Sequence, residues 1–138
     1  MKIIFQVNTN NRNIARLEKR LKSNAIEDLN KKYADKLIKE MKRLITTGTR
    51  TGNKYGDHIA SAPGEPPANW HGGLVDSMKA NRNNATEYVV EFTVPYAKDL
   101  EKGEGSVKGK PRPFVQPSVD KLLPQFEKEV ADIFKRFL

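Results

Sequence analysis

The sequence predicts an α+β fold, with a small antiparallel β-sheet flanked by a long N-terminal helix and a C-terminal helix. Two short runs, residues 2–7 and 87–94, alternate apolar and polar side chains as strands do. Elsewhere, apolar residues recur at every third or fourth position, which indicates amphipathic helices. The chain of 138 residues is interpreted as a single domain, residues 1–138, because 37% hydrophobic residues suffice for one modest core.

The first predicted helix follows an Asn-rich stretch, in which Asn11 or Asn13 can cap the free N–H groups of the first turn. Its apolar positions are Ile14, Leu17, Leu21, Ala25, Leu29, Tyr33, Leu37, Met41 and Leu44. The spacing is compatible with one long helix to about residue 45, or with two helices that break near Ser23 and Asn24. Basic residues lie beside this stripe, so we expect one apolar and one basic helix face.

A long Gly- and Pro-rich loop or arm is predicted over residues 46–73, where glycines allow backbone conformations that other residues resist. Residues 74–81 are read as a short helical turn or a strand. The strand at 87–94 then places Tyr88, Val90 and Phe92 on one face, with the other face mostly exposed to water.

The C-terminal part of the chain predicts two more helical segments. The sequence YAKDLEKG indicates one helical turn that is closed by Gly103. A final helix is expected from Ser118, with apolar side chains at helical spacing. Since Pro124 lies within its first two turns, this helix either begins later than Ser118 or kinks at the proline.

The net charge of +8 is unevenly distributed along the chain. Residues 1–55 contain 14 Lys and Arg against 5 Asp and Glu, whereas residues 56–138 contain 11 against 12. The candidate contacts to nucleic-acid phosphates or to an acidic partner are Lys31, Lys32, Lys39, Lys42 and Arg43. Such a block suits phosphates or an acidic protein, and it equally suits a solvated helix face.

No arrangement of catalytic or metal-binding residues is found, so no enzyme activity, cofactor or metal is predicted. His58 and His71 both lie in the long loop, without a nucleophile, a carboxylate pair or a ligand triad at recognisable spacing. The absence of cysteine rules out disulfides and thiolate ligands, which suits a protein that folds in a reducing cytoplasm. No apolar run approaches the roughly 18 residues that span a bilayer, so no membrane contact is expected.

The stretch SAPGEPPANW, residues 61–70, holds three prolines and the single tryptophan of the chain. We call these residues the strap. Proline fixes φ and lacks an N–H donor, so Pro63, Pro66 and Pro67 favour an extended, stiff course. Trp70 at its end suits an anchor in a pocket at a domain edge or at a subunit interface. The alternative is that the strap holds a loop onto its own domain, with Trp70 in the core.

Three motifs resemble one known family, the small head-tail joining or tail-completion proteins of long-tailed bacteriophages, often labelled neck or minor capsid proteins. Residues 61–78, SAPGEPPANWHGGLVDSM, are similar to the family's proline-rich segment with its G-x-L-x-x-S-[IM] run. Residues 95–103, PYAKDLEKG, resemble its Y-A-x-x-[LV]-E-x-G turn, and residues 112–121, RPFVQPSVDK, its R-P-F-[LV]-x-P-[AS] helix entry. The motifs occur in the family's order, and together with the basic amphipathic N-terminal helix the pattern spans nearly the whole chain.

The resemblance implies a structural virion protein at the neck or tail end, assembled in the cytoplasm of the bacterial host. It implies a ring, commonly of six subunits, whose partners are the tail tube protein and the head-connector or neck proteins, with packaged double-stranded DNA in the channel. The implied contact residues are Pro63, Pro66, Pro67, Trp70, Tyr96, Glu101, Arg112, Pro113 and Phe114. The alternative from another class is a free basic nucleic-acid-binding protein.

Overall fold

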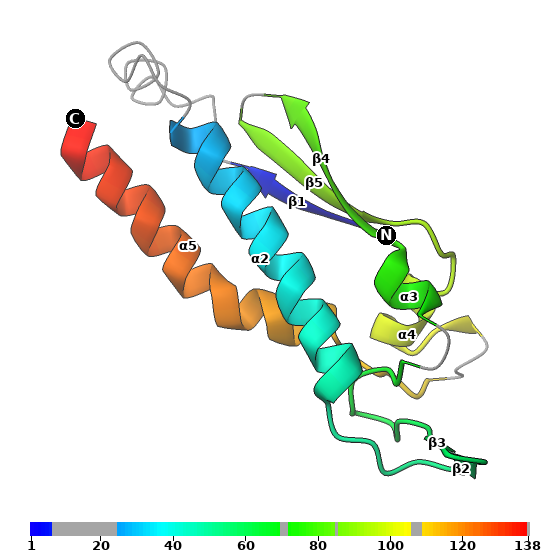
Figure 1. The fold of residues 1–138 in the computed structure, drawn as a ribbon. Helices are drawn as coiled ribbons and strands as arrows, with labels where there is room; N and C mark the ends of the chain where they lie inside the picture. Colours follow the sequence, from blue (N-terminus) through cyan, green and yellow to red (C-terminus); the bar gives the residue numbers. More distant parts are fainter. Residues whose placement is uncertain (7–24, 70–71, 85, 106–108, 138) are drawn as a thin grey trace.

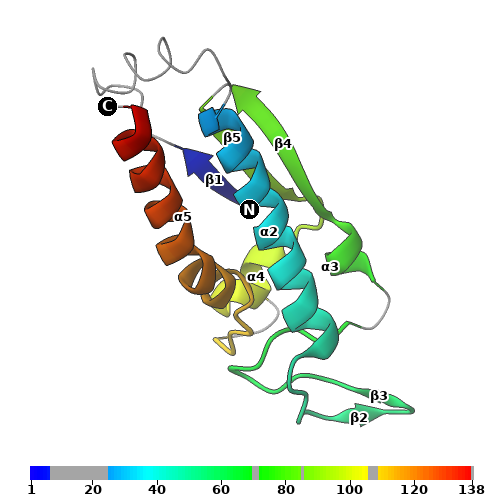
Figure 2. The same cartoon turned by 60° about the vertical axis from the view of Figure 1, so that its left-hand side comes forward.

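Figure 1 shows the computed structural model of the protein. It describes residues 1–6, 25–69, 72–84, 86–105 and 109–137. Within these ranges, a three-stranded antiparallel sheet is covered on one face by two long helices, and a two-stranded hairpin lies at one end of the molecule (Figures 1 and 2). The predicted α+β class, with its small antiparallel sheet and its long N- and C-terminal helices, is confirmed.

The sheet has the strand order β1-β5-β4, and both pairings are antiparallel. Strand β1, Lys2–Gln6, pairs with the central strand β5, Glu87–Phe92. Strand β4, Met78–Asn84, forms the other edge. Because β5 has a neighbour on each side, even Val89, on the face expected to be wet, is buried.

Helix α2, Ala25–Thr47, packs its apolar stripe against the sheet. Its buried residues are Ile26, Leu29, Asn30, Tyr33, Ala34, Leu37, Met41 and Ile45. The stripe predicted from residue 25 onward is therefore confirmed for its central members, since Leu29, Tyr33, Leu37 and Met41 all lie in the core. The members before residue 25, the two candidate caps and the question of one helix or two lie outside the described residues.

Helix α5, Val115–Phe137, runs antiparallel to α2 along the same face of the sheet (Figures 1 and 2). The Phe126 ring makes edge-to-face contacts with Phe5 of β1 and Tyr33 of α2, at centroid distances of 5.7 and 5.2 Å. Aromatic rings in this arrangement contribute about 0.5–1.5 kcal/mol beyond the area they bury. The Phe126 contacts thus join both helices and the sheet in one core.

The start of α5 corrects the sequence prediction. The helix begins at Val115, three residues before Ser118, and continues through Pro124 as one element. Pro117 is tolerated in the first turn because the N–H groups there have no partner within the helix. The other N–H groups at the start of α5 need acceptors, and another part of the chain supplies these acceptors, as shown below.

The region between α2 and β5 also differs in detail from the prediction. The long loop contains a short hairpin, formed by β2, Lys54–Tyr55, and β3, His58–Ile59. After the loop, the chain forms helix α3, Gly73–Asp76, and only then enters β4, so both readings of residues 74–81 are partly right. The helical turn before Gly103 is confirmed as α4, Ala97–Lys102.

Ion pairs tie α2 to α5 across their exposed edges. The Lys32 ammonium lies 2.9 Å from Glu129, and the Lys121 ammonium lies 3.2 Å from Glu40. Glu40 also accepts hydrogen bonds from Arg43 on its own helix, the shortest at 2.6 Å. The Arg43 bonds, with Lys121 adding to them, hold the pKa of the Glu40 carboxyl below its usual range, although partial burial opposes this.

We expect the Glu40 network to make the fold sensitive to acid. A carboxyl with a lowered folded-state pKa contributes stability above its unfolded pKa of about 4.3, and this contribution is lost as the pH falls through the lower, folded value. The Glu40→Gln variant should therefore lose less stability than the parent between pH 7 and pH 3, measured by urea denaturation. An equal loss in both proteins would contradict this role for Glu40.

Candidate binding site at the motif junction

The three motifs singled out in the sequence meet at one end of the molecule. The Gly64 N–H of the strap donates to the Pro111 carbonyl at 2.8 Å, and the Arg112 N–H donates to the Leu100 carbonyl of α4 at 2.7 Å. We call this region, residues 61–69, 96–104 and 110–116, the junction. These two backbone hydrogen bonds join residues that are 47 and 12 positions apart in the sequence.

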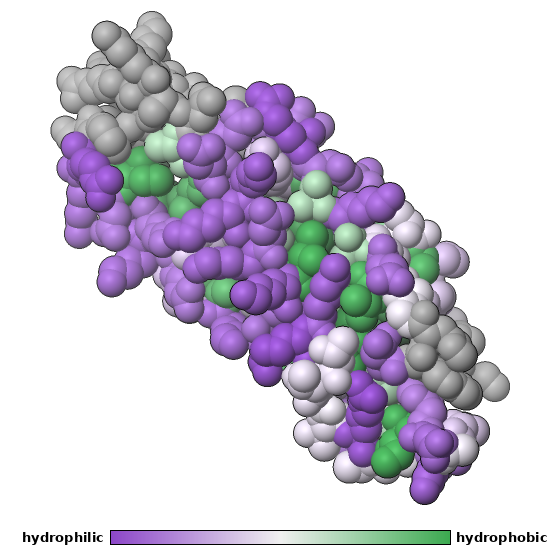
Figure 3. All heavy atoms as spheres, viewed as in Figure 1, coloured by the Kyte–Doolittle hydropathy of each residue, from purple (hydrophilic) through white to green (hydrophobic). Residues whose placement is uncertain are grey.

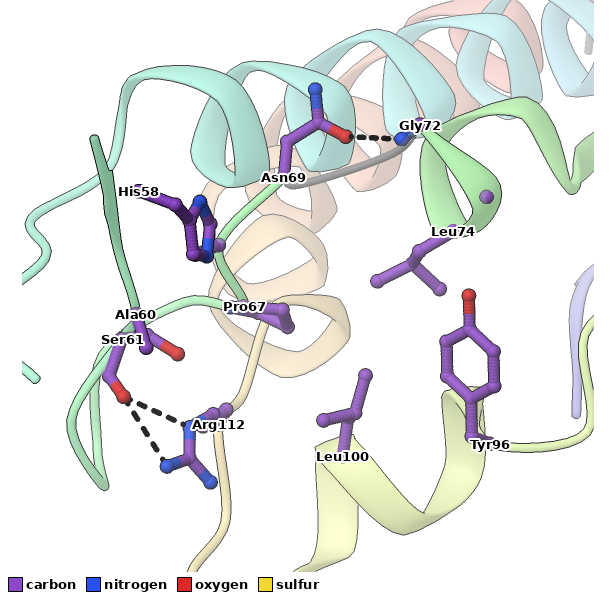
Figure 4. A pocket seen from close by; sticks show the side chains of 12 residues that line it. His58, Ala60, Ser61, Pro67, Asn69, Gly72, Leu74, Tyr96, Leu100 and Arg112 are labelled. Carbon is purple, nitrogen blue, oxygen red and sulfur yellow. Dashed lines mark hydrogen bonds between the residues drawn. The ribbon is translucent and has the colours of Figure 1, made fainter. Parts of the chain in front are cut away.

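Arg112 holds the strap against the start of α5. Its Nε and Nη2 groups donate to the Ser61 carbonyl at 3.3 and 3.2 Å, and its Nη1 group donates to the Lys110 carbonyl at 3.2 Å (Figure 4). Ser61 is buried. The guanidinium suits this position because its planar set of donors can serve several carbonyls at once.

Glu101 supplies the missing acceptors at the N-terminus of α5. Its Oε2 accepts the N–H groups of Phe114 and Val115 at 2.7 and 2.9 Å, and its Oε1 accepts the Gln116 N–H at 2.8 Å. A carboxylate at this end of a helix is also stabilised by the helix dipole. This contact explains why α5 begins before Ser118.

Glu65, within the strap, also accepts hydrogen bonds from backbone N–H groups. Its carboxylate accepts the N–H groups of Thr51 and Ala62, at 2.9 and 2.8 Å, together with the Thr51 hydroxyl. The hydrogen bond from the Thr51 hydroxyl is the main cause of a lowered pKa of Glu65, and the two backbone N–H groups add to it. The strap is therefore fastened to the loop after α2 as well as to Pro111.

Gly103 ends α4 in the left-handed conformation, with φ of 72°, and its N–H donates to the Asp99 carbonyl at 2.8 Å. A Cβ atom at this position would lie 2.9 Å from the Pro111 ring. The site therefore requires glycine both for its backbone and for the close approach of residue 111.

We expect Gly103→Ala to lower the free energy of unfolding by about 2 kcal/mol, because left-handed strain and the clash with Pro111 add. The matched control is Gly56→Ala at the hairpin turn. Gly56 has a similar φ of 63°, but no atom lies within 4 Å of a Cβ built there. Chemical denaturation of both variants separates the clash from the strain, and equal losses would contradict the close packing at Pro111.

A cavity of about 430 Å³ opens beside the junction (Figure 4). Its lining residues are His58, Ala60, Ser61, Pro67, Ala68, Asn69, Gly72, Gly73, Leu74, Tyr96, Leu100 and Arg112. The lining is mainly apolar, with a few polar groups at its edges. A space of this size and character suits the side chains of a protein partner or a small ligand.

The residues implied by the resemblance fall into two groups. Pro63 and Tyr96 are exposed, whereas Pro66, Arg112 and Pro113 are half-buried. Phe114 is 0% exposed and Pro67 is buried, so both side chains pack within their own chain. The Glu101 carboxylate is also bound within its own chain, through hydrogen bonds to the start of α5. Trp70 and His71 lie outside the described residues, although Asn69 and Gly72 on either side of them line the cavity.

Sequence reasoning missed Glu65 as a fastening residue, together with the cavity and the hairpin. The sequence did hold a signal for Glu65. Its neighbours are prolines and a glycine, whose side chains offer no acceptor for nearby backbone N–H groups, whereas the Glu65 carboxylate does. The cavity depends on Leu74 and Leu100, which belong to different motifs. Their proximity follows only from the tertiary fold.

The outer face of α2 is hydrophilic (Figure 3). Its charges are mixed, which corrects the expectation of a basic face. Lys31, Lys32, Lys39 and Arg43 are exposed and Lys42 is half-buried. The exposed Asp28 and Asp35 lie among them, and Lys32 and Arg43 are paired with Glu129 and Glu40. Residues 25–47 contain 6 Lys and Arg and 4 Asp and Glu, whereas residues 1–24 contain 6 Lys and Arg and 1 Glu. Much of the basic excess therefore lies in residues 1–24.

Two features are absent from the residues that the structure describes. These residues contain no group of three or more His, Cys, Asp or Glu side chains placed to hold a metal ion. No helix among them has the length and apolar character needed to cross a membrane. Comparison of the chain with protein-family models, curated proteins and solved structures yields no match.

Proposed function

We propose that this protein is a structural component of a tailed-bacteriophage virion, which completes the tail and joins it to the head without catalysis. The observation that carries the proposal is the junction. The strap, the α4 turn and the entry to α5 are the segments in which the sequence resembles joining proteins, and hydrogen bonds link all three. A shared local structure is a physical reason for the three motifs to occur together in one chain.

In this proposal the protein acts as a ring of copies, commonly six, located at the neck or tail end. Glu101, Phe114 and Gly103 shape the junction from within, while the exposed Pro63 and Tyr96 and the rim of the cavity face neighbouring subunits. The tail tube protein and the head-connector or neck proteins are the partners. Contact with packaged DNA falls to Lys31, Lys39 and Lys42, for which the described residues provide no ion pair.

Negative-stain imaging of particles assembled without the protein tests this function. Filled heads without tails, next to free tails of normal length, would support a joining role. Overlong tails would instead indicate that the protein terminates tail growth. Normal complete particles would contradict both roles, because each requires the protein for a finished neck.

A gel-shift titration against salt separates this proposal from free nucleic-acid binding. We expect affinity for duplex DNA no tighter than about 10 µM at physiological salt, in the range of weak non-specific binding. The mixed charge of α2 and the pairing of Lys32 with Glu129 support this expectation. Micromolar or tighter binding that falls steeply with salt would favour the alternative, a nucleic-acid-binding protein.

Trp70→Ala should weaken self-association more than it destabilises the monomer. A buried interface tryptophan contributes about 2 kcal/mol or more, so association should fall roughly thirtyfold or more. Association is measured by analytical ultracentrifugation over a concentration series, and the stability of the monomer by thermal unfolding. A drop of several degrees in Tm with unchanged association would show that Trp70 fixes the strap to its own domain.

A further inference from the structure

Strand β4 forms an open edge of the three-stranded sheet. Within the described residues it pairs with β5 on one side and has no strand on its other side. Both views place β4 at the side of the molecule opposite to α5 (Figures 1 and 2). A strand that adds to β4 therefore does not meet α5.

The hydrogen-bond pattern shows which backbone groups of β4 point out of the sheet. The Thr93 N–H donates to the Ser77 carbonyl at 3.1 Å, just before the strand begins. Hydrogen-bonded and non-hydrogen-bonded pairs alternate along an antiparallel ladder, so from Ser77 onward every second residue bonds to β5. The intervening residues, Met78, Ala80 and Arg82, direct their N–H and C=O groups away from β5. These groups are the donors and acceptors that an added strand uses.

Helix α2 and the following turn hold the far end of β4 in place. The Asn30 side chain, which is 0% exposed, donates from its amide to the Thr86 carbonyl at 2.8 Å. Asn84 accepts the Thr86 N–H at 3.0 Å, and Arg82 forms an ion pair with Glu27 of α2. An edge strand that is already fixed loses little conformational freedom when a partner strand pairs with it.

The sequence of β4 is complementary to a second copy of itself in one antiparallel register. When Ala80 lies opposite Ala80 of the second copy, Met78 faces Arg82 and Lys79 faces Asn81. All three residues with outward backbone groups then pair, and the smallest side chain lies on the two-fold axis. A register centred on Lys79 or on Arg82 would instead place like charges directly opposite each other, which destabilises strand pairing.

An irregularity in β4 limits the length of the segment that can pair. The register with β5 shifts between Arg82 and Asn84, and bulges of this kind disrupt pairing at sheet edges. The regular part is residues 78–82, which at about 3.4 Å per residue extends roughly 17 Å. A contact of this length is smaller than the roughly 800 Å² per partner of a stable complex, so we expect it to dissociate on dilution.

We propose that two copies of this chain pair their β4 strands antiparallel about a two-fold axis at Ala80, which joins their three-stranded sheets into one. The same surface is used by both copies, so the contact is isologous and closes after two copies. This inference goes beyond the proposed function and does not rest on it, because a ring is built from contacts between two different surfaces.

Because the chain has no cysteine, the register can be tested by disulfide formation between copies. Lys79→Cys and Asn81→Cys each replace an exposed residue on the face of the sheet that the helices leave open. In the proposed register these positions form a non-hydrogen-bonded pair, with Cα atoms about 4.5 Å apart, which a disulfide can bridge. Two copies of the same variant hold their cysteines at diagonal positions, about 7–8 Å apart, beyond the usual reach of a disulfide.

An equal mixture of the two variants in a glutathione redox buffer should form the mixed 79–81 disulfide preferentially. We expect it to exceed the 79–79 and 81–81 disulfides at least about tenfold when the linked peptides are quantified by mass spectrometry. A purely statistical distribution of the three disulfides would overturn the proposal. A predominant 79–79 or 81–81 disulfide would also overturn it, because the strands would then pair in another register or in parallel.

Charge changes test the same contact without a covalent bond. Asn81→Asp places a carboxylate opposite Lys79 at both symmetric positions, so the dissociation constant of the dimer should fall roughly fivefold, and Asn81→Lys should raise it by a similar factor. The matched controls are the same two changes at the exposed Asn53, which lies beside β2 at the other end of the molecule (Figure 1). Sedimentation velocity over a concentration series measures each constant.

Equal shifts for the changes at Asn81 and Asn53 would overturn the pairing, since net charge alone would then explain them. A protein that stays monomeric at every concentration would overturn it as well. The imaging of particles made without the protein is unaffected by either outcome, so the proposed function is judged separately.

Discussion

Phe114→Ala is expected to lower the free energy of unfolding by about 3–5 kcal/mol, as for other fully buried phenylalanines. The Phe114 side chain is 0% exposed and packs edge-to-face against Phe92 of β5, with the ring centroids 5.6 Å apart. Its loss would leave a cavity between the junction and the sheet, where neighbouring atoms are held in place by backbone hydrogen bonds. Chemical denaturation measures the change directly.

The matched control for Phe114 is Leu123→Ala on α5. Leu123 is a large apolar residue that is exposed, and alanine preserves the helix, so its free energy of unfolding should change by no more than about 0.5 kcal/mol. If Phe114→Ala instead left stability intact and abolished only self-association, its side chain would belong to the interface. That outcome would support the interface role that the sequence resemblance implied.

Glu101→Gln is expected to have the second-largest effect, a loss of about 2–3 kcal/mol in the free energy of unfolding. Glutamine keeps the size of the side chain but offers one acceptor oxygen in place of two, so at least one of three backbone donors loses its partner. Hydrogen bonds to a charged group contribute about 1.5–3 kcal/mol, and the helix dipole no longer acts on a negative charge.

Amide hydrogen exchange gives a local measurement of the Glu101 contact. In Glu101→Gln the amides of residues 114–116 should exchange faster, while those in the centre of α2 change only with global stability. The control is Glu104→Gln, because Glu104 is exposed and its ion pair with Lys98, at 3.7 Å, is long. Unchanged protection at residues 114–116 would show that other groups satisfy the start of α5.

Local sequence patterns were sufficient to predict the elements whose buried face follows one regular spacing of apolar residues. The stripe of Leu29, Tyr33, Leu37 and Met41 predicted the buried face of α2, because each side chain meets the same layer of the core. The alternation along β5 predicted its core face for the same reason. Gly103 predicted the end of α4, since a left-handed residue must follow the last helical turn.

The start of α5 could not be predicted from local sequence. A helix that begins at residue 115 needs acceptors for its first N–H groups, and the sequence before it offers Arg112, Pro113 and Phe114, none of which can supply one. The acceptor is Glu101, 13 to 15 residues earlier in the chain. Without that contact in view, the helix was expected from Ser118, and Pro124 indicated either a later start or a kink.

The charge of α2 was misjudged for a similar reason. Counting Lys and Arg along the helix gives a basic segment, yet Lys32 meets Glu129, which lies 97 residues later. The cavity at the junction also depends on partners that are distant in sequence. The motifs indicated which segments matter, but their meeting point and the projecting hairpin became evident only in the folded chain.

The pairing of β1 with β5 has a consequence for how the protein is made. Lys2 pairs with Glu91, so β1 cannot join the sheet until the roughly ninety residues that lead to its partner in β5 have been synthesised. Throughout that interval β1 has no strand partner, while α2 can already form from local interactions. β1 can therefore dock only after β5 has been synthesised, whereas β4 and β5, which are neighbours in the sequence, can pair without it.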